Sequence, residues 1–182
     1  MNPSFHDVIA ASDAERRDLF LGTAARLGTA VQNVEKDFWV CWTLDALFNG
    51  LTVGGPRLLF KGGTSLSKAF GLISRFSEDI DITVFRNDLG QAADVAELTA
   101  LSGKKRRARL DAIRTACQAY IEGPLTVQFT QLAASVIPEA RFRLEPDLED
   151  KDGQTLLFWY PAVTATGGDD VRSAVKIEPG AK

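Results

Sequence analysis

Asp79-Ile80-Asp81-Ile82-Thr83-Val84-Phe85 alternates aspartate with isoleucine and is rich in β-branched residues, a pattern typical of a β-strand. Successive side chains of a strand point to opposite faces, so both aspartates lie on one face, about 7 Å apart. Upstream, Arg57-Leu58-Leu59-Phe60 has the length of a short strand and leads directly into Lys61-Gly62-Gly63-Thr64. We therefore expect a strand, a glycine turn, a helix over about 65–71 and the aspartate strand, in that order.

The glycine turn has the features of a phosphate-binding site. Gly62 and Gly63 allow the backbone to approach an anion closely, and Thr64 and Ser65 can donate hydroxyl groups beside the amides of the next helix. The turn is not a Walker A loop, because no lysine follows the second glycine and Lys68 lies within the helix. Lys61 is either a substrate contact or a surface charge at the strand end. The candidate nucleotide-binding residues are Lys61, Gly62, Gly63, Thr64 and Ser65.

Asp79 and Asp81 are the candidate metal ligands. Two carboxylates on one strand face repel each other unless a cation lies between them, although a solvated strand edge is the alternative explanation. Mg²⁺, with Mn²⁺ as a second option, prefers carboxylate oxygens and completes its coordination with substrate phosphates. A phosphate-binding turn followed by paired carboxylates therefore predicts metal-assisted phosphoryl or nucleotidyl transfer.

The composition excludes several other chemistries. The one histidine, His6, is expected in a loose N-terminus, which excludes a Ser-His-Asp triad and a multi-histidine metal site. Cys41 and Cys117 lie far apart, which favours a reduced, cytoplasmic protein. The apolar runs are too short to span a membrane. A net charge of -3 argues against nucleic-acid binding over the whole surface.

The rest of the chain alternates between helical and strand patterns. Helical periodicity covers 13–27, 33–48 and 91–123, the last broken near Ser102-Gly103. Strand patterns cover 125–129, 141–144, 155–160 and 172–178.

This order of elements predicts an α+β (mixed α/β) fold. We expect helices in residues 1–50 to pack on a core formed by residues 51–182, within one continuous domain. The aromatic residues are assigned to that core, namely Phe38, Trp39, Trp42, Phe158, Trp159 and Tyr160.

Three motifs resemble those of the AbiEii/AbiGii-type toxins, which belong to the DNA polymerase β-like nucleotidyltransferase superfamily. They are Glu35-Lys36-Asp37-Phe38-Trp39-Val40, Lys61-Gly62-Gly63-Thr64 and Arg75-Phe76-Ser77-Glu78-Asp79-Ile80-Asp81. The resemblance covers roughly residues 34–178 and implies a mixed sheet flanked by helices. It also implies that the helical C-terminal domain of the family is absent here.

The resemblance adds two residues to the candidate site. Val175-Lys176-Ile177-Glu178 is similar to a Lys-Ile-Glu strand of the family, which implies that Glu178 is a third metal ligand. Lys176 would then offset the charge of the triphosphate. The candidate catalytic residues are Asp79, Asp81, Lys176 and Glu178. Period-2 alternation places Lys176 and Glu178 on one face, as needed if their strand lies beside the aspartate strand.

The family implies a magnesium-dependent toxin that transfers a nucleotide from an NTP to RNA, such as the tRNA 3′ end, and that has an antitoxin encoded nearby. Two alternatives remain open: transfer to a protein side chain, and NTP binding without turnover. The basic run Lys104-Lys105-Arg106-Arg107-Ala108-Arg109 is either a solvated helix start or an RNA-binding surface. Lys36 and Asp37 are either a structural pair or nucleotide contacts, and Arg75 either anchors the strand or contacts phosphate.

Overall fold

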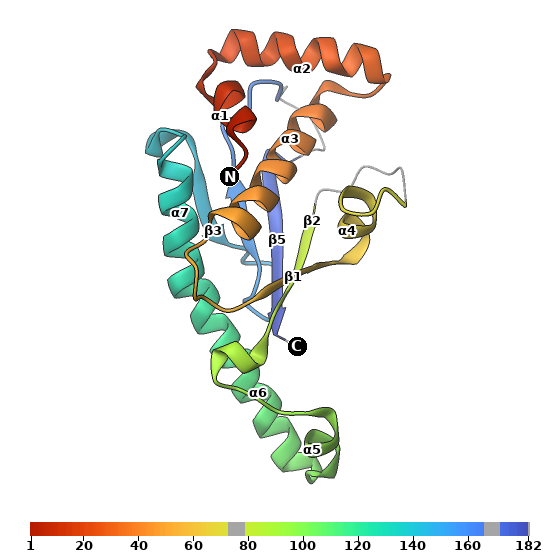
Figure 1. The fold of residues 1–182 in the computed structure, drawn as a ribbon, viewed down its shortest axis with the longest axis vertical. Helices are drawn as coiled ribbons and strands as arrows, with labels where there is room; N and C mark the ends of the chain where they lie inside the picture. Colours follow the sequence, from red (N-terminus) through yellow and green to blue (C-terminus); the bar gives the residue numbers. More distant parts are fainter. Residues whose placement is uncertain (73–78, 166–171, 182) are drawn as a thin grey trace.

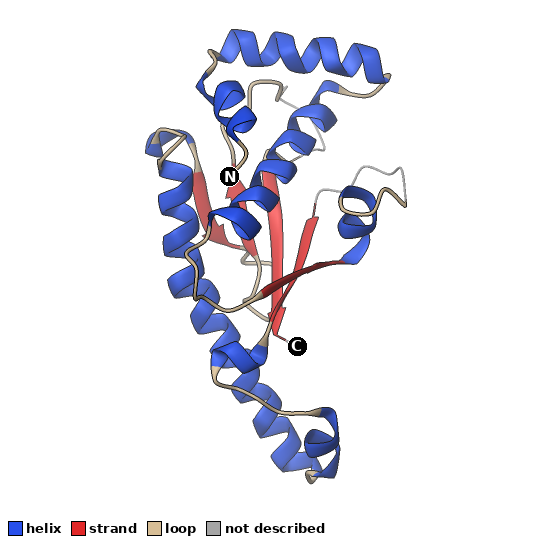
Figure 2. Cartoon of the chain, in the orientation of Figure 1, coloured by secondary structure: helices blue, strands red, loops and turns tan. Residues whose placement is uncertain are grey.

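Five strands form one mixed sheet, in the order β1-β2-β5-β4-β3 (Figures 1 and 2). The computed structural model describes residues 1–72, 79–165 and 172–181. Strand β2 runs antiparallel to β1 and parallel to β5, and the β5–β4 and β4–β3 pairs are antiparallel. The strands are β1 (Leu58–Lys61), β2 (Asp79–Val84), β3 (Arg143–Pro146), β4 (Leu156–Trp159) and β5 (Ala174–Ala181).

Helices pack against this sheet and confirm the mixed α+β class expected from the sequence. Short π-helical turns, η1 (Ala46–Gly50) and η3 (Ile121–Leu125), continue two of the α-helices. The α-helices of the described residues are α1 (Pro3–Ala10), α2 (Asp13–Leu27), α3 (Val31–Asp45), α4 (Gly62–Lys68), α5 (Val95–Ala100), α6 (Gly103–Tyr120) and α7 (Thr126–Ala134). Helix α4 begins three residues earlier than expected, because the glycine pair belongs to its first turn.

One face of the sheet forms the hydrophobic core. Ile80 and Ile82 of β2 are fully buried there. Phe158 of β4 contacts Trp42 of α3 and Phe129 of α7, with both ring centroids 5.2 Å away. Helices α3 and α7 therefore cover the isoleucine face. Alternation places Asp79 and Asp81 on the opposite face, which we call the open face.

The N-terminus is helical, so the expectation of a loose segment around His6 was wrong. Asn2 caps α1 by accepting a hydrogen bond from the Ser4 amide at 3.0 Å, and Pro3 occupies the first turn, where its missing N–H costs nothing. Phe5 packs edge-on against Phe38, and Ile9 is buried in the core. The cap and the proline were visible in the sequence as helix-start signals.

Residues 125–129 are helical, with Leu125 ending η3 and Thr126 beginning α7, so the predicted strand was also wrong. Leu125, Phe129 and Ala133 are all buried, and their spacing of four residues is that of one helix face. The five-residue window Leu-Thr-Val-Gln-Phe alternates apolar and polar residues and is too short to separate the two periods. In the described ranges, no helix is both long and apolar enough to cross a membrane.

Candidate active site

The central feature of the open face is a row of charged residues across three neighbouring strands. Asp81 of β2 is paired with Lys61 of β1 on one side and with Glu178 of β5 on the other. Asp79 is paired with Lys176. Directly opposed residues of neighbouring strands share a face, and the strands lie about 4.8 Å apart. The sheet thus brings the four predicted catalytic residues and Lys61 onto one surface.

Two of these carboxylates form ion pairs with lysines. The Lys61 ammonium donates to Asp81 Oδ1 at 3.3 Å, and the Lys176 ammonium donates to Glu178 Oε1 at 2.8 Å. Lys176 also lies 3.8 Å from Asp147 Oδ2. The hydrogen bond to Glu178 raises the pKa of Lys176, with smaller contributions from the negative charges nearby. Lys176 is therefore a cation at any physiological pH.

The three carboxylates of the open face are ligands that a hard divalent cation prefers, but they do not converge on one position. Among the described residues, no group of three or more His, Cys, Asp or Glu side chains lies close enough to hold a metal ion. Asp81 and Glu178 instead face Lys61 and Lys176. An ion between the strands would compete with the two lysines for these carboxylates. The metal role of Asp79, Asp81 and Glu178 stays a prediction.

Residue 62 must be a glycine, because the carboxylate of Asp81 occupies the space that a side chain would need. Its φ angle is 74°, in the left-handed region that favours glycine. A Cβ atom built on Gly62 would lie 2.0 Å from Asp81 Oδ2. The first turn of α4 can therefore approach the aspartate strand only because residue 62 has no side chain.

The hydroxyl groups after the glycines bind the protein backbone. Thr64 is buried, and its Oγ1 donates to the carbonyl of Asp79 at 2.5 Å, which ties α4 to β2. The Ser65 hydroxyl donates to the Gly62 carbonyl at 2.8 Å. No side chain of the described residues caps the N-terminus of α4, where Gly62 and Gly63 lie in the first turn. The backbone amides are thus better placed than the two hydroxyls for the predicted phosphate contact.

Three consecutive residues of α3 link it to other parts of the fold. The buried Glu35 carboxylate accepts hydrogen bonds from the amides of Val163 at 2.8 Å and Thr164 at 2.9 Å. The buried Lys36 ammonium donates to the carbonyl of Arg172 at 2.9 Å.

Asp37 forms an ion pair with Lys68 of α4. These contacts favour a structural role for Lys36 and Asp37 over a role as nucleotide contacts. Arg75, Phe76, Ser77 and Glu78 lie outside the described residues.

Trp159 lies outside the core, contrary to the expectation from the sequence. Phe158 and Tyr160 are core residues, but Trp159 is half-buried on the open face, paired with Ala174 of β5. Its indole N–H donates to Glu145 Oε1 at 2.8 Å, and the Arg143 guanidinium lies 5.0 Å from its ring centroid. The run 156–160 is apolar at every position, so its composition does not show which face each residue occupies.

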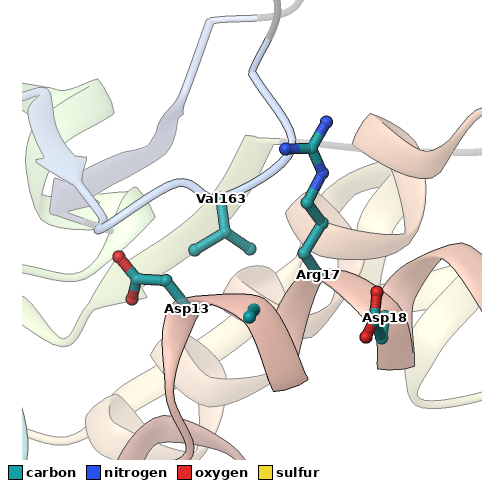
Figure 3. Close-up of a pocket in the computed structure, with 5 residues that line it drawn as sticks. Asp13, Arg17, Asp18 and Val163 are labelled. Atoms are coloured by element: carbon teal, nitrogen blue, oxygen red, sulfur yellow. The ribbon is translucent and has the colours of Figure 1, made fainter.

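One pocket, which we call the α2 hollow, lies away from the charged row of the open face. It has a volume of about 390 Å³ and lies between α2 and the connection after β4 (Figure 3). Asp13, Arg17 and Asp18 line it from α2, and Val163 lines it from the connection. None of the predicted site residues borders this hollow, so it is not part of the candidate active site.

The mixed sheet, the glycine-started helix and the aspartate strand beside a carboxylate strand define a nucleotidyltransferase-type fold. The chain belongs to the AbiEii family, because the family described as "Nucleotidyl transferase AbiEii toxin, Type IV TA system" matches residues 45–182. Neither the curated proteins nor the solved structures give a match to this chain. The matched range contains all nine predicted site residues and excludes the Glu35-Lys36-Asp37 motif.

Proposed function

We propose that the chain is a metal-dependent nucleotidyltransferase toxin that transfers a nucleotide from an NTP to an RNA acceptor, such as the 3′ end of tRNA. The family supports nucleotidyl transfer and an antitoxin partner. The observation that carries the mechanism is the register that pairs Asp81 with both Lys61 and Glu178, two positions along the strands from the pair of Asp79 and Lys176.

In this proposal the open face binds the reacting groups. Asp79, Asp81 and Glu178 would hold Mg²⁺, which would polarise the attacking hydroxyl and neutralise phosphate charge. The amides of Gly62 and Gly63, in the first turn of α4, would donate to the phosphates. With an ion held by the carboxylates, Lys61 and Lys176 would be available to contact the triphosphate. The acceptor oxygen bonds to the α-phosphorus, pyrophosphate leaves, and a site carboxylate takes the hydroxyl proton.

An exposed group of cations supports RNA as the acceptor. Helices α5 and α6 project beyond the sheet at the lower end of the view (Figure 1). The buried residues of α6 are Ile113, Cys117 and Tyr120, so its first ten residues extend past the core. Lys104, Lys105, Arg106 and Arg107 are exposed there and form no ion pair with any described residue. We call residues 95–112 the basic arm.

The test is transfer of labelled nucleotide to total tRNA with Mg²⁺ present. The double variant Asp79→Asn with Asp81→Asn should abolish labelling, while Asp152→Asn with Glu122→Gln, which removes two exposed carboxylates elsewhere, should keep it. Retained labelling in the first variant would overturn the proposed site. Label in added protein instead of RNA would show that the acceptor is a side chain. Tight NTP binding without any transfer would show a binding module.

A further inference from the structure

We propose that a cavity on the open face, beside Lys176, binds a nucleobase that carries an exocyclic amino group. This inference rests on the proposed function, because it supplies base recognition for the same site. The cavity has a volume of about 410 Å³ and is bordered by Asp147, Glu149, Leu157, Trp159 and Arg172. The volume is within the range of pockets that hold small organic ligands.

The position of the cavity fits a nucleotide that lies across the sheet. Leu157 of β4 is paired with Lys176 of β5, and Lys176 is paired with Asp79 of β2. Two strand spacings, about 10 Å, therefore separate the cavity floor from the aspartate strand. A nucleotide with its phosphates beside Asp79 and Gly62 would extend its base over β4.

The floor of the cavity suits a flat ring. Leu157 is 7% exposed, and Trp159 follows it on the same face of β4, since side chains two positions apart on a strand share a face. Glu145 and Arg143 fix the indole of Trp159 through a hydrogen bond and a cation–π contact. An aromatic side chain held in one orientation is a good stacking surface, because little conformational freedom is lost when a base binds.

The wall of the cavity carries two carboxylates, Asp147 and Glu149, beside the guanidinium of Arg172. Arg172 lies 3.8 Å from Glu149 Oε1, and the Lys176 ammonium lies 3.8 Å from Asp147 Oδ2. Carboxylates accept hydrogen bonds and donate none when ionised. Asp147 is 7% exposed, and its Oδ1 accepts the Glu149 amide at 3.1 Å, which fixes the carboxylate in place. Glu149 lies at the rim with a side chain that is 81% exposed. Cytosine, adenine and guanine present an amino group to such a wall, whereas uracil presents a carbonyl oxygen.

Cytidine and uridine provide a matched pair for the test, since they differ at this amino group. Tryptophan fluorescence reports the cavity, because Trp39 and Trp42 are each 1% exposed and Trp159 is accessible. Titration of the full chain, without metal or triphosphate, should show saturable quenching by cytidine and at least tenfold weaker binding of uridine. Calorimetry of Trp159→Phe should retain cytidine binding while the fluorescence change is lost.

Two variants test the wall, and one tests for a general effect of charge. Asp147→Asn should reduce the preference for cytidine over uridine about tenfold, and Glu149→Gln, at an exposed position that does not affect folding, should reduce it severalfold. Glu122→Gln removes an exposed carboxylate elsewhere and should leave the preference unchanged. Equal binding of both nucleosides, or no binding of either, overturns the inference.

The base could come from the NTP or from the end of the acceptor RNA, and inhibition of transfer separates these sources. Cytidine that competes with NTP assigns the cavity to the incoming nucleotide, and cytidine that competes with tRNA assigns it to the acceptor. Either pattern supports the base site. Cytidine binding without any transfer activity would count against the proposed function and not against the cavity, so the two failures are distinguishable.

Discussion

The Cα atom of Gly62 lies against the carboxylate of Asp81, so closely that a Cβ atom at position 62 would be 2.0 Å from Asp81 Oδ2. Gly62→Ala should therefore displace the aspartate or the start of α4. We expect transfer activity to fall at least tenfold. We also expect the free energy of unfolding to fall by about 1–2 kcal/mol from the positive φ alone. Urea unfolding and nucleotide incorporation measure the two effects.

Gly28→Ala is the matched control for this prediction. Gly28 has a φ of 66° at the end of α2, and apart from its chain neighbours no heavy atom of the described residues lies within 4 Å of its Cβ position. The control should lose a similar free energy of unfolding from backbone strain and keep its activity. Equal activity in both variants would show that the contact between Gly62 and Asp81 has no role in the reaction.

Glu35 should be important for stability. Its carboxylate accepts from the amides of Val163 and Thr164 and from the Thr164 hydroxyl, in a buried position. Glu35→Ala leaves these donors without an acceptor and should cost about 3 kcal/mol of unfolding free energy. Glu35→Gln keeps one acceptor oxygen and should cost less. Urea unfolding compares the two with Glu122→Gln, and an unchanged Glu35→Ala midpoint would contradict the prediction.

The sequence predicted those elements whose periodic pattern is long enough to distinguish a strand from a helix. Alternation in 79–85 and 172–178 identified two strands and the face of each carboxylate. The window 125–129 failed because five residues match both periods, and only the spacing of the buried residues through Ala133 identifies a helix.

Contacts between segments that lie far apart in the chain could not be predicted from the sequence. The register that pairs Asp81 with Glu178 depends on the packing of a whole sheet, and no local pattern encodes it. The half-buried position of Trp159 on the open face was missed because both faces of β4 carry apolar residues: Leu157, on the open face, is 7% exposed, and Phe158 is fully buried. The Lys61 and Lys176 contacts with the carboxylates follow from the same register.

Cys117 should make stability depend on pH in the alkaline range. Burial raises its pKa from 9.0 to about 11, because the charged thiolate is poorly solvated inside the core. The unfolded chain loses this proton at lower pH than the folded chain. The contribution of Cys117 is therefore complete below pH 9 and is lost as the pH rises towards 11.

The measurement is urea unfolding at several pH values between these limits. Cys117→Ala should show a shallower decline of the free energy of unfolding than the parent chain. In a Cys41→Ala background, a thiol reagent at mildly alkaline pH should label native Cys117 slowly and the urea-unfolded chain quickly. Equal labelling rates in the two states would contradict the burial of this thiol.

The basic arm should bind RNA at a cost to the stability of its own helix. Lys104 and Lys105 lie in the first turn of α6, where the helix dipole disfavours positive charge, and neither has an ion pair with a described residue. Lys104→Gln with Lys105→Gln should therefore raise the free energy of unfolding by about 0.3–1 kcal/mol per cation removed.

The same change, Lys104→Gln with Lys105→Gln, should reduce the slope of log affinity against log salt by about 0.7–0.9 for each RNA phosphate that the arm no longer neutralises. Fluorescence anisotropy with labelled tRNA measures the slope, and Arg17→Gln with Arg26→Gln, two exposed cations of α2, is the matched control. An equal change of slope in both variants would mean that RNA is attracted by overall charge and not by the arm.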